Sequence, residues 1–127
     1  MSNKEKENSY ISIKIEMLHK LLLDVGKVEF SVLLIISSFA DEFGESKVSQ
    51  RKIAEISGLS LPSINKAVNN LLKKKVDGKH VVKRKLINIS ERKTYSIYKL
   101  NNPFFLQRMY LLAVLIKTLH LPILIYS

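Results

Sequence analysis

Residues 47–75 read KVSQRKIAEISGLSLPSINKAVNNLLKKK and decide the fold. They contain two helix patterns separated by a turn of about four residues, which is the spacing that a helix-turn-helix requires. Ser49 can cap the first helix, and we expect Ile53, Ala54 and Ile56 to face inward from it. Gly58 fits the turn, because glycine adopts the left-handed conformation that bulkier residues resist.

The second helix of the pair is predicted over residues 61–74. Ser60 can cap it, and Pro62 falls in its first turn, where the missing amide would have no intrahelical partner anyway. The spacing predicts a buried stripe and, opposite to it, a polar face. The stripe consists of Ile64, Ala67, Val68 and Leu71, and the outward positions are Ser63, Asn65, Lys66, Asn69 and Asn70.

A β-hairpin is predicted after this helix. Asp77-Gly78 is a turn signal, and two β-rich runs follow at residues 80–89 and 94–100, joined by residues 90–93. We expect Tyr95 and Tyr98 to pack on the sheet and not to stack on bases. Two helices followed by a hairpin indicate a mainly α fold with a small β-hairpin wing, a winged helix-turn-helix, followed by a hydrophobic C-terminal helix.

The remaining segments supply the rest of the expected domain. Residues 1–9 are predicted to be a disordered leader, residues 10–101 the winged helix-turn-helix domain, and residues 102–127 a hydrophobic C-terminal tail or helix. Within the domain, a short extended segment leads into a helix that should end near Gly26. A strongly apolar core helix is expected over residues 30–43, with Gly44 closing it.

Charge divides the chain unevenly. Residues 1–46 hold eight acids and five bases, a balance of −3, whereas residues 47–127 hold three acids and sixteen bases, a balance of +13; together they give the net charge of +10. A basic half of this kind is typical of proteins that face a polyanion, although a solvated basic face is the alternative. The chain has no cysteine. We expect no disulfide or thiolate chemistry and a cytoplasmic location.

The pattern predicts binding to double-stranded DNA. With its stripe buried, helix 61–74 can enter a major groove about 12 Å wide, where asparagine amides pair with adenine edges. Asn65 and Lys66 are the predicted base readers, and the first turn of the preceding helix should clamp phosphates. The full predicted DNA-binding set is Gln50, Arg51, Lys52, Ser60, Ser63, Asn65, Lys66, Asn69, Asn70, Lys73, Lys83, Arg84, Lys85, Arg92 and Lys93. An ordinary helical hairpin with polar outer residues is the alternative, and the basic wing argues against it.

Three stretches carry a family resemblance: YISIKIEMLHKLLL (10–23), the run from VLLIISSFADEF to NKAVNNLL (32–72) and TYSIYKLNNPFF (94–105). They resemble the N-terminal winged-helix domain of phage and plasmid replication initiators of the Gram-positive type. The resemblance implies binding to origin DNA and replication proteins as further partners. Winged-helix transcriptional repressors share the IAEISGLS type of turn, so a regulator of transcription remains the alternative.

Nothing in the sequence predicts an enzyme. The four glycines are isolated and form no phosphate-cradling loop, and no acidic pair stands out as an acid–base couple. His19, His80 and His120 are scattered without the spacing of metal ligands. We therefore expect no catalytic residues, no metal and no cofactor. A protein-interaction module or membrane-anchored adaptor is a further alternative, since a winged helix need not bind DNA.

The tail leaves three alternatives open. Residues 109–126 are long enough to span a bilayer, but Lys117, His120 and Pro122 bring the insertion energy near break-even, which makes a membrane less favoured than a soluble role. A dimerisation helix is the second alternative, because a two-fold dimer reads a palindromic site. Its contact residues would be Leu111, Leu112, Leu115 and Leu119. The third is that the tail is a truncated or frame-altered end.

Overall fold

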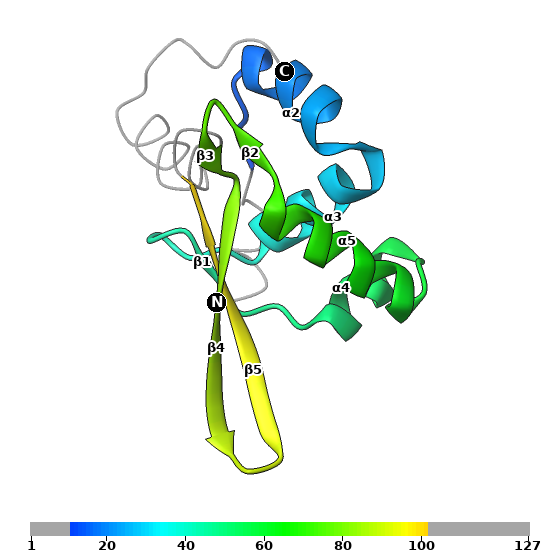
Figure 1. The fold of residues 1–127 in the computed structure, drawn as a ribbon, viewed down its shortest axis with the longest axis vertical. Coiled ribbons are helices and arrows are strands. Elements are labelled where there is room, and N and C mark those ends of the chain that lie inside the picture. Colours follow the sequence, from blue (N-terminus) through cyan, green and yellow to red (C-terminus); the bar gives the residue numbers. More distant parts are fainter. Residues whose placement is uncertain (1–10, 102–127) are drawn as a thin grey trace, which may run out of the picture.

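A computed structural model of the protein describes residues 11–101 (Figure 1). The predicted leader and the predicted C-terminal tail, including its proposed membrane or dimer helix, lie outside the described residues. The helices are α2 (Ile15–Val25), α3 (Lys27–Ser38), α4 (Gln50–Ser57) and α5 (Leu61–Lys73). The strands are β1 (Glu45–Ser46), β2 (Lys75–Val76), β3 (Lys79–His80), β4 (Val82–Ser90) and β5 (Lys93–Leu100). Four helices with a protruding hairpin confirm the predicted helix-turn-helix with a wing.

The strands form two small antiparallel sheets. The three-stranded sheet has the order β1-β5-β4, and β2 pairs with β3 in a separate hairpin. The strands β4 and β5 continue beyond the helical body as a long two-stranded ribbon, which we call the wing (residues 82–100; Figure 1). Glu91 and Arg92 alone connect the two strands, so the turn is shorter than the predicted 90–93. The short strand β1 was not predicted, because two residues carry no periodicity.

The core lies between the helices and the base of the wing. Leu33 and Ile36 of α3, Ile53 of α4 and Ile64 of α5 are all fully buried, and Tyr98 of β5 closes the same cluster. The predicted stripe of α5 is confirmed, since Ala67, Val68 and Leu71 also belong to this cluster. Tyr98 packs as predicted, whereas Tyr95 lies near the wing tip and is 36% exposed.

The core helix differs from its prediction at both ends. Helix α3 begins at Lys27 and ends at Ser38, several residues before Gly44. The Asp41 side chain accepts hydrogen bonds from the backbone amides of Phe43 and Glu45, both at 2.9 Å. A side chain that binds nearby amides in this way competes with helix formation. Gly44, at φ 78°, therefore ends this turn and not the helix, and Phe43 is exposed.

Two glycines, Gly26 and Gly78, were predicted to lie at the end of a helix and in a turn. Gly26 separates α2 from α3 with φ 104°, so α2 ends where the sequence indicated. Asp77 and Gly78 both have positive φ, 54° and 77°, as a two-residue hairpin turn of the primed type requires. That turn joins β2 to β3, a hairpin that the sequence analysis had not separated from the wing.

The hydrophobic stripe of α5 can be tested by mutation. Ile64→Ala should lower the free energy of unfolding by about 2–5 kcal/mol, because the side chain is fully buried and its removal leaves a cavity. Urea denaturation of the full chain measures this change. Ile56→Ala is the matched control, since this isoleucine is 49% exposed. A loss at Ile56 equal to that at Ile64 would contradict the burial pattern of the helix pair.

Candidate nucleic-acid interface

The helix pair is held by caps at its two starts and by a left-handed residue between the helices. The Ser49 hydroxyl accepts a hydrogen bond from the Lys52 amide at 3.0 Å, and the Ser60 hydroxyl accepts one from the Ser63 amide at 3.3 Å. Gly58 ends α4 at φ 75° and ψ 5°, and its amide donates to the Ala54 carbonyl oxygen. These three features confirm the predicted caps and turn, although three residues and not four separate the helices.

One inward assignment in α4 is wrong. Ile53 is fully buried and Ala54 is half-buried, but Ile56 is 49% exposed. Because α4 has only eight residues and lies at the surface, its contact with the neighbouring helices is a narrow stripe centred on Ile53. The side of α4 that carries Ile56 is thus part of the outer surface.

The three residues predicted to contact phosphates lie in the first turn of α4. Gln50 is half-buried, whereas Arg51 and Lys52 are exposed. The Lys52 ammonium lies 3.6 Å from a carboxylate oxygen of Glu55, three residues further along the helix. An exposed pair of this kind contributes at most about 1 kcal/mol, so it leaves Lys52 able to exchange Glu55 for a phosphate.

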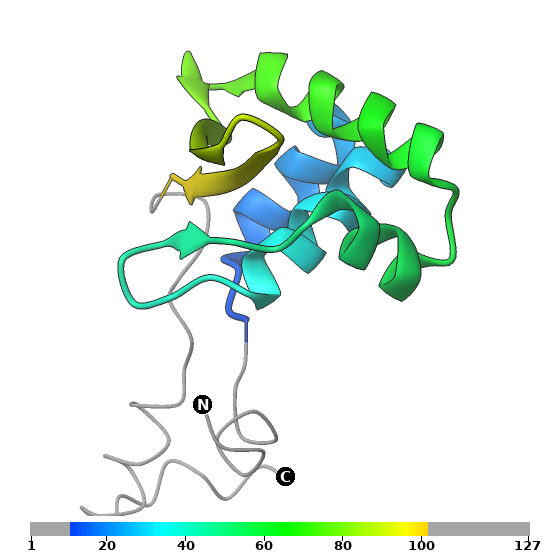
Figure 2. The same cartoon turned by 90° about the horizontal axis from the view of Figure 1, so that it is seen from below.

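Three of the polar side chains on the outer face of α5 point to solvent without an intramolecular partner among the described residues: Asn65, Lys66 and Asn69. Lys73 is exposed at the C-terminal end of the same face. In Figure 2, α5 runs along one side of the molecule, with the wing seen nearly end-on beneath it. Helix α5 also contacts β4, so the helix that carries the free polar side chains lies next to the wing.

Three other members of the predicted set make internal contacts. The hydroxyls of Ser60 and Ser63 lie 2.8 Å apart and bond to each other at the start of α5. Asn70 is half-buried, and its amide nitrogen donates to a carboxylate oxygen of Glu29 at 3.1 Å. The assignment of Asn70 as an outward position is therefore wrong: this side chain fastens α5 to α3. DNA contact by any of these residues stays a prediction.

The wing separates its basic residues onto two faces. Residues directly opposite each other in an antiparallel pair share a face. Lys83 lies opposite Lys99, and Arg84 lies opposite the buried Tyr98. Lys83 and Lys85 therefore occupy the face away from the core, while Arg84, half-buried, occupies the face that packs on it. Arg92 and Lys93 are exposed at the tip.

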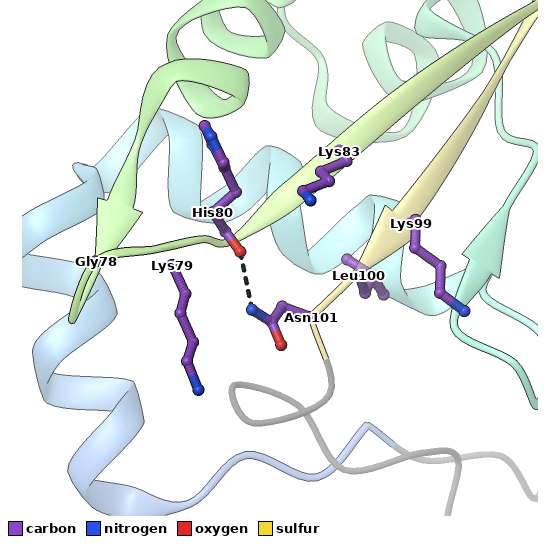
Figure 3. Close-up of a pocket in the computed structure, with 7 residues that line it drawn as sticks. All are labelled: Gly78, Lys79, His80, Lys83, Lys99, Leu100 and Asn101. Atoms are coloured by element: carbon purple, nitrogen blue, oxygen red, sulfur yellow. Dashed lines mark hydrogen bonds between the residues drawn. The ribbon is translucent and has the colours of Figure 1, made fainter.

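The predicted DNA-binding set does not include Lys79 and Lys99, although both are basic residues of the β-rich region. With Lys83 they line an open hollow of about 640 Å³ at the base of the wing (Figure 3). The Asn101 side chain donates to the His80 carbonyl oxygen at 3.1 Å and fixes the end of β5 there. The Lys99 ammonium donates to the Phe43 carbonyl oxygen, which ties it to the turn after α3. The positive charge of the wing thus extends to its base.

Lys20 binds Asp77 away from the predicted interface. The two charged groups lie 2.5 Å apart and connect α2 to the β2–β3 turn. This hydrogen bond raises the pKa of the Lys20 ammonium above its usual value. Asp77 is one of three acidic residues in the basic half of the chain. Because its carboxylate is paired with Lys20, it competes less with an anionic ligand for the other basic side chains.

The part of the chain that the structure describes was also searched for metal sites and for membrane-spanning helices. Among residues 11–101, no three histidine, cysteine or acidic side chains are grouped so that they could hold a metal ion. No helix in the same range has the length and apolar character needed to cross a membrane.

Comparison with known proteins supports the assignment of the helix pair. Residues 26–75 match a family model described as a helix-turn-helix domain, which covers 50 of the 127 residues. The matched range contains α3, α4, α5 and the first residue of β2. Searches of curated proteins and of solved structures found no match. The chain thus contains a helix-turn-helix domain, and this domain supports binding to double-stranded DNA.

The two neighbouring asparagines of α5 should respond differently to mutation. Asn70→Ala should cost about 1 kcal/mol of unfolding free energy, because it leaves the Glu29 carboxylate without its partner. Asn69→Ala should stay within about 0.5 kcal/mol of the parent protein, since this side chain is exposed and unpartnered. Urea denaturation of the full chain measures both. The reverse order would refute the structural role given to Asn70.

Proposed function

We propose that the protein binds a specific sequence of double-stranded DNA, with α5 in the major groove and the wing on the adjacent backbone, and that it acts in the initiation of plasmid or phage replication. The observation that carries the DNA-binding part is the combination of a free polar face on α5 with a basic wing beside it. The match to a helix-turn-helix domain supports the same placement of α5.

Charge supports a division of labour between the two elements. The wing, residues 82–100, carries six basic side chains and one acidic side chain, a balance of +5. Helix α5, residues 61–73, carries Lys66 and Lys73 and no acid, a balance of +2. Contacts to phosphates supply affinity and positioning, whereas contacts to base edges supply the preference for one sequence. The wing therefore fits the first role and α5 the second.

The initiator role is supported by the resemblance over residues 10–105 and has a rival, a winged-helix repressor of transcription. The two roles share the same residues and differ in where the binding site lies. Sites recovered from a random pool can be located in the replicon that encodes the protein. We expect the site in a replication origin, and we expect deletion of the gene to abolish copying of the replicon. A site that overlaps a promoter, with copying intact, would favour the repressor.

A second candidate function, a protein-interaction module, is favoured by one feature of α2. Ile15, Leu22 and Leu23 of this helix are 72%, 41% and 85% exposed, and their spacing places them on one side of it. An exposed apolar stripe of this kind is a surface on which another protein can pack. Failure to bind any duplex at low salt would favour this candidate over both DNA-binding roles.

The electrostatic role of the wing predicts a strong dependence on salt. If six to ten phosphates are contacted, the affinity for DNA should fall by roughly a thousandfold or more between 50 and 200 mM salt. Lys85→Ala should weaken binding to all sequences alike and reduce the slope of log K against log salt by about one. Gel-shift titrations at several salt concentrations measure both quantities.

Lys14→Ala is the matched control for the wing variant. Lys14 is exposed at the start of α2, at the opposite end of the molecule from the wing (Figure 1). Its loss should leave the salt slope unchanged. An equal reduction of the slope by Lys14→Ala and Lys85→Ala would show that net charge and not the wing determines binding.

A further inference from the structure

The exposed side chains of α5 form a ridge that begins at its first residue. Leu61, Asn65, Asn69 and Lys73 follow each other at intervals of four, and all four are exposed. Side chains four apart lie next to each other along a helix surface. Four residues at about 1.5 Å each place successive members of the ridge about 6 Å apart along the axis. Base pairs in DNA are about 3.4 Å apart, so one step of the ridge spans roughly two base pairs.

The neutral hydrogen-bonding groups on this ridge are two amides. Asn65 and Asn69 have no intramolecular hydrogen bond among the described residues, in contrast to Ser63 and Asn70. An asparagine amide matches the adenine edge in the major groove, because it accepts from the N6 amino group and donates to N7 at the same time. Both free amides of α5 are therefore suited to the same base.

Helix α5 lacks arginine and the carboxylates, which are specific partners of guanine and cytosine. Its sequence, LPSINKAVNNLLK, contains no arginine, aspartate or glutamate. Arginine is the side chain whose planar fork fits guanine, and the carboxylates accept from cytosine. Lysine can bond guanine as well as phosphate, and Lys66 was predicted as a base reader. As compact point charges on flexible stems, Lys66 and Lys73 fix no planar geometry on a base, so we assign them to phosphates.

Two exposed leucines adjoin the amides at the start of the helix. Leu59 in the turn and Leu61 in the first position of α5 are each 38% exposed. The N-terminal residues of a recognition helix are the ones that contact base edges. The C5-methyl group of thymine is the apolar group that a base pair presents in the major groove. An exposed leucine at this place therefore finds its apolar partner on A·T base pairs.

We infer that α5 selects A·T base pairs, with Asn65 and Asn69 bound to adenine edges and Leu61 against a thymine methyl group. The inference rests on the proposed placement of α5 in the major groove and specifies the DNA that it selects. The ridge spacing adds that the two adenine-dependent positions lie roughly two base pairs apart.

Selection from a random duplex pool by the full chain tests the amides. We expect A·T pairs at two positions roughly two base pairs apart, and replacing either pair by G·C should weaken binding about 5- to 150-fold. Asn65→Ala and Asn69→Ala should each lose the preference at one of these positions. The two variants serve as controls for each other, because each should keep the preference at the position that the other one loses.

Uracil in place of thymine tests the leucine. The exchange removes the methyl group and leaves the hydrogen-bonding edge intact, so it should weaken binding of the parent protein a few-fold at the selected site. Leu61→Ala should lose most of this sensitivity. Leu23→Ala is the control, since Leu23 is 85% exposed on α2, and should retain it.

The outcomes separate this inference from the function on which it rests. Tight binding to selected sites that are G·C at the positions sensitive to Asn65 or Asn69 would overturn the A·T assignment and leave DNA binding intact. Equal binding to all duplexes would overturn the A·T assignment together with the sequence preference in the proposed function, and would leave only non-specific DNA binding. No binding to any duplex at low salt would overturn the proposed function and this inference together.

Discussion

Four side chains of α5 are buried in the core, and the orientation of the exposed face of α5 depends on that packing. They are Ile64, Ala67, Val68 and Leu71. Burying a side chain the size of isoleucine, valine or leucine contributes about 1.5–3 kcal/mol. A helix of thirteen residues that is anchored on one side presents its other side at a fixed rotation. The free amides of Asn65 and Asn69 are exposed because the stripe is buried.

The anchoring of α5 does not depend on apolar contact alone. The bond from Asn70 to Glu29 joins α5 to the first turn of α3, where a carboxylate is also favoured by the helix dipole. A Cβ at Gly26 would lie 2.8 Å from a carboxylate oxygen of the same Glu29, at a φ of 104° that side chains resist. The absence of a side chain at Gly26 thus leaves room for the Glu29 carboxylate, which binds Asn70 of α5.

The sequence predicted the parts of this structure that depend on local chemistry. Serine caps, a glycine with positive φ and a four-residue apolar stripe are each signalled by residues close together in the chain, and all of them were found. The predicted end of α3 was wrong, because the Asp41 side chain accepts hydrogen bonds from two nearby backbone amides and forms a turn after the helix. Apolar periodicity does not register such a competing hydrogen bond.

The candidate site was predictable in position and less so in the role of each residue. The outward face of α5 follows from helical spacing, but the spacing could not show that Asn70 is bonded to Glu29 or that Ser60 and Ser63 bond to each other. The bond from Asn70 to Glu29 joins residues 41 apart in the chain, which no local window of sequence contains. The Ser60–Ser63 bond is local, but it depends on how the two hydroxyls are turned. Lys83 and Arg84 were grouped together by charge, although side chains alternate along a strand and the pairing of β4 with β5 places the two on opposite faces.

Placing charge on the wing and amides on α5 has a consequence for recognition. Contacts to phosphates are the same for every sequence, so a change in salt alters affinity for all sites by a similar factor. Contacts from neutral amides and leucines release few counterions, and the ratio between the preferred site and other sites then varies little with salt. In the proposed mode of binding, the wing balance of +5 against the +2 of α5 assigns affinity mainly to the wing and selectivity to α5. On that proposal, a loss of wing charge lowers occupancy without changing which site is occupied.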